Sequence, residues 1–79
     1  MNLAQAVGKR TQELLFKKNM TQYRLTKITC LNPKTMSDLI NGRTTDVKLS
    51  TIFLIVNALE MSLTDFFNSK LFENFNIMI

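Results

Sequence analysis

The most constraining feature of the chain is the dipeptide Asn32-Pro33, which lies inside the segment 21–42. An asparagine can cap the free backbone donors of a helix start, and proline fits the first helical turn. Because proline disfavours helical geometry in the residue before it, any helix that contains Leu25 must end before Asn32. A connection of about three residues, beginning at Cys30, holds the two helices at roughly 90–120°, which is helix-turn-helix geometry.

Further start and stop signals predict helices on both sides of this segment. Thr21 and Ser62 are suitable N-caps, and Asn19 and Gly42 are suitable left-handed helix terminators. Apolar residues at helical spacing fill the intervals between these signals. The sequence therefore predicts an all-α chain of five helices. They span 3–18, about 22–29, 33–40, a fourth stretch from Lys48 or Ser50 to about Leu59, and a fifth that opens at 62–65, contains Phe66 and Phe67 and could extend to Leu71 and Phe72.

The apolar faces of these helices indicate which side chains form the core. Leu25 and Ile28 are expected to face inward from the second helix, and the third helix is expected to bury Met36, Leu39 and Ile40. The fourth helix is apolar on more than one face, so something must cover Leu54.

Composition excludes several classes of function. The chain has no His and a single Cys, so it cannot form a zinc finger, a disulfide scaffold or a His-based catalytic site. We therefore expect no enzyme activity and no cofactor, metal or small-molecule ligand. No apolar run approaches about 18 residues, and the first ten residues lack the order of a secretory signal. These features predict a cytoplasmic protein with no membrane partner.

Positive charge is concentrated in the first part of the chain. Residues 1–48 carry nine Lys or Arg and three acidic residues, whereas residues 49–79 carry one Lys and three acidic residues. This asymmetry favours a polyanion-facing surface on the first three helices, although a merely solvated surface has the same composition.

From about Val7 to Phe67 the chain resembles the Cro and phage-repressor type of helix-turn-helix domain, also called the XRE family. The residues that carry the resemblance are Gln22, Leu25, Leu31, Met36, Leu39 and the Asn41-Gly42-Arg43 stop, followed by 49–59, 61–63 and Phe66-Phe67. The resemblance implies a five-helix lambda-repressor-like fold with the motif at helices 2 and 3. Residues 1–70 would form the DNA-binding domain, and 71–79 an apolar tail within that domain or at a dimer interface.

Two residues depart from the family pattern. Cys30 stands where the family usually has Gly, and Thr26 where it usually has Ala. A side chain in a left-handed turn costs about 1–2 kcal/mol, so these changes bear on the rigidity of the turn and on stability.

The resemblance also implies which residues contact double-stranded DNA, because the third helix of such domains enters the major groove. The expected base contacts are Pro33, Lys34, Thr35, Ser37 and Asp38. The expected phosphate contacts are Gln22, Tyr23, Asn32, Asn41, Arg43 and Thr44. Lys34 can donate to guanine and Asp38 can accept from cytosine N4. Alternatively, Lys34 and Asp38 simply pair with each other on the helix. Tyr23 either contacts the DNA backbone or covers the second helix.

The resemblance implies a sequence-specific transcriptional regulator, a repressor encoded by a bacterium or phage, that binds a palindromic operator as a homodimer. The candidate dimer surface comprises Leu54, Phe72, Phe75, Ile77, Met78 and Ile79. The same apolar residues could instead fold onto their own core or hold another protein. The alternative function is a protein-interaction module, such as an antitoxin-like or anti-repressor domain.

Overall fold

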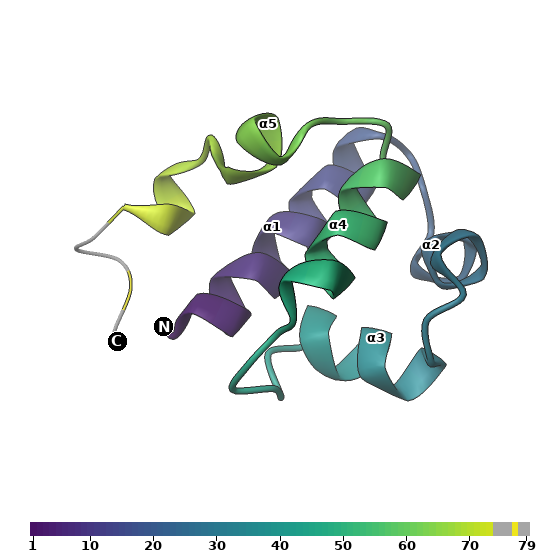
Figure 1. The fold of residues 1–79 in the computed structure, drawn as a ribbon, viewed down its shortest axis with the longest axis horizontal. Helices are drawn as coiled ribbons and strands as arrows, with labels where there is room; N and C mark the ends of the chain where they lie inside the picture. Colours follow the sequence, from purple (N-terminus) through teal and green to yellow (C-terminus); the bar gives the residue numbers. More distant parts are fainter. Residues whose placement is uncertain (74–76, 78–79) are drawn as a thin grey trace.

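The computed structural model describes residues 1–73 and residue 77, and its regular elements are all helical (Figure 1). They are α1 (Leu3–Lys17), α2 (Gln22–Thr29), α3 (Pro33–Ile40), α4 (Leu49–Ala58), α5 (Leu63–Phe67) and a short 3₁₀ helix, η1 (Lys70–Phe72). Figure 1 shows α2 and α3 at one end of the molecule and α5 with η1 at the other, with α1 and α4 between them. None of the described helices is both long and apolar enough to span a membrane.

The expected capping residues set the helix boundaries. The side chains of Thr21, Asn32 and Ser62 accept hydrogen bonds from the backbone at the starts of α2, α3 and α5. Asn19 and Gly42 have positive φ angles of 57° and 73°, as expected of helix terminators. The bounds of α2 and α3 match the prediction, and α1 ends one residue before the predicted boundary.

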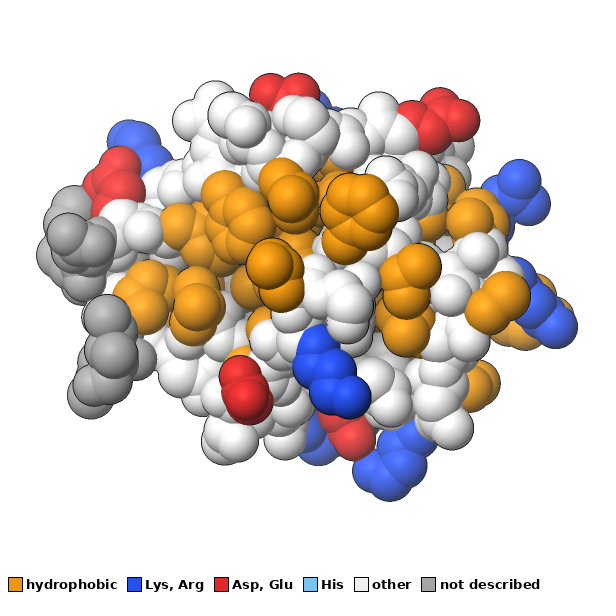
Figure 2. Space-filling view, viewed as in Figure 1, with side chains coloured by type: hydrophobic (Ala, Val, Ile, Leu, Met, Phe, Trp, Pro, Cys, Tyr) orange, Lys and Arg blue, Asp and Glu red, His pale blue; other side chains and the backbone are white. Residues whose placement is uncertain are grey.

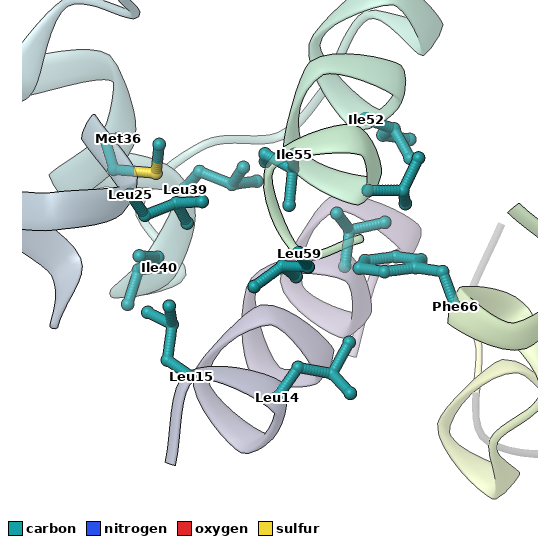
Figure 3. Packing of buried hydrophobic residues seen from close by; sticks show 12 residues of the cluster. Leu14, Leu15, Leu25, Met36, Leu39, Ile40, Ile52, Ile55, Leu59 and Phe66 are labelled. Atoms are coloured by element: carbon teal, nitrogen blue, oxygen red, sulfur yellow. The ribbon is translucent and has the colours of Figure 1, made fainter. Parts of the chain in front are cut away.

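Side chains from the five α-helices meet in one hydrophobic core. Its buried members are Val7, Leu14, Leu15, Leu25, Met36, Leu39, Ile40, Ile52, Ile55, Val56, Leu59 and Phe66. In Figure 3 the side chains from α2 and α3 point towards those of α1 and α4, and Phe66 reaches in from the opposite side. The prediction that Met36, Leu39 and Ile40 form the inner face of α3 is confirmed.

Helix α1 packs closely against the end of α3 at Gly8. A Cβ atom on Gly8 would lie 2.0 Å from the carbonyl oxygen of Leu39, so only glycine fits there. Beside this contact, Gln12 Nε2 donates to the carbonyl oxygen of Ile40 at 2.7 Å. About one turn before Gly8, Gln5 Nε2 donates to the carbonyl oxygen of Gly42 at 3.4 Å. One stripe of α1 therefore fixes the C-terminal end of α3.

The fifth helix is shorter than predicted. It ends at Phe67, and Leu71 and Phe72 belong to the separate η1. The physical reason is a break at Ser69, which is extended (φ −152°, ψ 147°) and whose hydroxyl caps Leu71. Phe72 then packs against Phe67 at 4.8 Å between ring centroids.

One expectation about a buried side chain is wrong. Ile28 is 46% exposed, because the inner stripe of the short α2 passes through Leu25 and Thr29 instead. Leu54 is 41% exposed, so the described part of the chain does not supply the full cover that we expect for it. Ile77 is half-buried, whereas the expectations for Phe75, Met78 and Ile79 lie outside the described residues.

Candidate nucleic-acid interface

The two departures from the family pattern lie in α2 and in the turn that follows it. Cys30 has φ 58° and ψ 22°, the left-handed conformation expected of it. Thr26 is half-buried and its hydroxyl donates to the carbonyl oxygen of Gln22 at 2.8 Å. Thr29 is buried and donates likewise to Leu25 at 2.9 Å. Since both threonine hydroxyls in α2 are satisfied within the helix, the two threonines are accommodated without an unpaired polar group.

The outer face of α3 is polar and accessible. Pro33, Lys34 and Thr35 are exposed, and Ser37 and Asp38 are half-buried. The opposite face is fixed in the core by Met36, Leu39 and Ile40. The structure thus brings all five expected base-contact residues onto the solvent side of one helix, with no large apolar side chain among them.

Lys34, Ser37, Asp38 and Arg43 are joined in one hydrogen-bonded group, which we call the α3 charge cluster. Lys34 Nζ donates to Asp38 Oδ2 at 3.0 Å, and Arg43 Nε donates to Asp38 Oδ1 at 3.0 Å. Arg43 Nη2 also donates to Ser37 Oγ at 3.0 Å. The hydrogen bonds from Lys34 and then Arg43 hold the pKa of the Asp38 carboxyl below its ordinary value. The expected pairing of Lys34 with Asp38 is therefore present, and Arg43 joins it.

The backbone turn after α3 explains how Arg43 reaches back to the helix. Gly42 is left-handed, and its N–H bonds to the carbonyl oxygen of Leu39 at 3.2 Å. The N–H of Arg43 bonds to the carbonyl oxygen of Asp38 at 2.8 Å. These two bonds form a Schellman motif, which reverses the chain and lays Arg43 alongside the last turn of α3.

The expected phosphate contacts surround this face. Tyr23 is 71% exposed, and the ammonium of Lys27, one turn later on α2, lies 5.3 Å from the centroid of the Tyr23 ring. Asn41 Nδ2 donates to the carbonyl oxygen of Ser37 at 2.9 Å. At the edges of the same surface, Gln22 and Thr44 are half-buried and Asn32 is exposed.

Arg10 is the residue whose role sequence reasoning missed most clearly. From the sequence alone, Arg10 counts only among the basic residues of 1–48. In the structure its Nε donates to the carbonyl oxygen of Phe66 at 2.7 Å, and its Nη2 donates to the carbonyl oxygen of Asp65 at 2.8 Å. Arg10 therefore satisfies the C-terminal end of α5. No sequence pattern indicated this contact. Gly8 did carry a signal, since an isolated glycine inside a helical pattern often marks a close packing contact.

The part of the chain that the structure describes contains no candidate metal site. No three His, Cys, Asp or Glu side chains gather there as a potential metal site. The charged groups that do gather, in the α3 charge cluster, pair with one another at the surface.

Comparison with known proteins gives one family and one similar structure. The family of Cro/C1-type HTH DNA-binding domains matches residues 11–70. A solved structure with the same fold is the restriction-modification controller protein C.Esp1396I, described as a tetramer in complex with its natural 35 base-pair operator. The TM-score is 0.76 at 24% sequence identity, over 85% of this chain and 87% of that chain. No curated protein matches the sequence.

Proposed function

Since the chain belongs to the family of Cro/C1-type HTH DNA-binding domains, we propose that it is a transcriptional repressor that binds a palindromic operator as a homodimer. The observation that carries this proposal is the outer face of α3. Its five polar or small residues are exposed at 33–35 and half-buried at 37–38, opposite a buried inner face. Helix-turn-helix proteins insert such a face into the major groove.

Both helices of the motif have a part in this mode of binding. The N-terminal half of α3 would meet base edges, where Lys34 can donate to guanine O6 and N7. The N-terminus of α2, which begins at Gln22, would meet a phosphate, because its free backbone N–H groups favour an anion. Tyr23, the second residue of α2, is exposed beside this N-terminus.

The dimer is supported by an apolar surface away from α3. Leu49, Phe53 and Leu54 on α4 are 68%, 52% and 41% exposed. Figure 2 shows hydrophobic side chains in a band across the face of the molecule over α4 and η1. One small domain makes few DNA contacts, whereas a symmetric pair reads two half-sites about 34 Å apart. The α4 surface is the candidate for that pairing.

The same α4 surface is the observation that favours the alternative, a protein-interaction module of the antitoxin-like or anti-repressor kind. Such a module would use Phe53 and its neighbours to hold another protein. An interaction module would not explain why the outer face of α3 lacks large apolar side chains. Such a face suits DNA bases better than a protein partner.

The test is selection from a random duplex library at about 0.1 M salt, followed by titration of the enriched duplex at several salt concentrations. We expect an inverted repeat with half-sites one helical turn apart. If no sequence is enriched, or if binding is equally tight to all duplexes, the proposal is wrong and the interaction module is favoured.

The selected duplex then tests whether α3 reads it. Lys34→Ala should weaken binding to the selected duplex by about 1–3 kcal/mol. It should also relax the sequence preference at the base pair that Lys34 contacts. Lys9→Ala removes the same charge from the exposed side of α1 and is the matched control. Equal losses in the two variants would mean that α3 contributes charge alone.

A further inference from the structure

The α3 charge cluster presents a hydrogen-bond donor directly beside an acceptor. Lys34 Nζ and Asp38 Oδ2 are 3.0 Å apart on the exposed side of the helix, with 82% and 27% of their side-chain surfaces accessible. Each oxygen of a carboxylate can accept more than one hydrogen bond, and an ammonium has three N–H donors. Both groups can therefore keep their mutual contact and still bind a base.

This arrangement is complementary to one base pair. In the major groove a G·C pair places the guanine acceptors N7 and O6 beside the N4 amino donor of cytosine. An ammonium matches the two adjacent acceptors, and a carboxylate matches the amino group. An A·T pair offers no two adjacent acceptors, because the N6 amino group separates adenine N7 from thymine O4. Lys34 and Asp38 together therefore fit G·C.

Arg43 restricts where the carboxylate of Asp38 can point. Its guanidinium holds Asp38 Oδ1 and Ser37 Oγ at the same time, each at 3.0 Å, and leaves Oδ2 directed to Lys34. The turn at Gly42 fixes the backbone from which Arg43 reaches. A lysine at position 43 would keep the positive charge, but it lacks the rigid two-pronged donor group of arginine.

We infer that Lys34 and Asp38 jointly read a single G·C base pair in each half-site, and that Arg43 is the positioning residue that orients Asp38 for this contact. The inference rests on the proposed function, and it adds the identity of one base pair and the group that sets it. It also gives Arg43 a part in specificity in addition to the expected phosphate contact.

The experiment repeats the library selection with the wild-type chain and with Asp38→Ala, Arg43→Lys and the double variant. The affinities are then measured for the selected duplex and for one with the G·C pair replaced by A·T. Asp38→Ala should reduce the preference for G·C on the order of tenfold. Arg43→Lys should reduce the preference at the same base pair and keep the salt dependence. The double variant should lose no more preference than Asp38→Ala alone.

Three results overturn the inference. If Asp38→Ala weakens or strengthens binding to all duplexes equally, Asp38 reads no base. If Arg43→Lys keeps the full preference, or if its effect adds to that of Asp38→Ala, Arg43 does not act through Asp38. In all three cases an enriched operator remains and only this inference fails, whereas the absence of any enriched sequence removes the proposed function as well. Thermal melting of each variant shows that it is folded at the assay temperature.

Discussion

The contact between α1 and α3 gives the sharpest prediction of stability. In Gly8→Ala the new Cβ would lie 2.0 Å from the carbonyl oxygen of Leu39, whereas ordinary contact begins at 3.4 Å. The obstacle is backbone in a helix, so no side-chain rotation can relieve it. Helix α3 must retreat from α1 by about 1.4 Å, the difference between these two distances.

The cost of that movement can be estimated from its parts. Inserting a methyl group into a packed interior costs about 1–3 kcal/mol. The retreat also stretches the hydrogen bonds that Gln5 and Gln12 make to the end of α3, each of which contributes about 0.5–1.5 kcal/mol. In the opposite direction, alanine has a higher helix propensity than glycine, which stabilises α1 by about 1 kcal/mol. We expect a net loss of about 2–3 kcal/mol, which lowers Tm by roughly 10–20 °C in a domain of this size.

Urea and thermal unfolding, followed by circular dichroism, measure this loss. Lys9→Ala, at the next and exposed position of the same helix, is the control and should change stability by less than about 0.5 kcal/mol. Because α3 carries the residues expected to contact bases, Gly8→Ala should also weaken operator binding at temperatures where it is still folded. A variant as stable as the wild type would show that propensity outweighs packing here, and would refute the reasoning.

Three further predictions concern other parts of the fold. Arg10→Ala removes both hydrogen bonds to the end of α5 and should lower stability by about 1–2 kcal/mol in urea unfolding; an unchanged midpoint would contradict this capping role. The pKa of Asp38 is lowered in the folded state, so its contribution to stability is complete above the ordinary value of 3.8 and is lost as the pH falls through the lowered pKa. Unfolding at several pH values should therefore show wild type and Asp38→Asn converging only in strong acid, and convergence already at pH 6 would exclude this cause. Phe53→Ser should shift the mass measured by light scattering from dimer to monomer, whereas Phe16→Ser, at a side chain 90% exposed on α1, should not; equal behaviour of the two variants would exclude α4 as the dimer surface.

The sequence predicted the local features of the motif well, because the determinants of helix ends lie within a few residues of those ends. Asn32 and Pro33 start α3 by capping and by a fixed φ angle, and both effects act within one turn. The left-handed conformation of Cys30 was implied by the family resemblance, because the family usually has glycine at this position. These signals placed the expected base-contact residues on the exposed side of α3.

The same reasoning was weaker where burial depends on a neighbouring element. Ile28 satisfies the helical period of α2, but no described element covers it, and it is exposed. Leu71 and Phe72 continue an apolar pattern, yet the extended Ser69 separates them from α5. Apolar periodicity shows which face of a helix can be buried, and it does not show whether another element reaches that face.

The sequence by itself determined the order and type of the helices, the ends of α2 and α3, and the polar character of the outer face of α3. Tertiary structure alone decided that Gly8 touches Leu39 and that Arg10 caps a helix 56 positions later. The physical reason is that caps and periodicity act through neighbours in the chain. A close helix crossing, or a guanidinium bound to a distant carbonyl, exists only once the core has brought separate helices together.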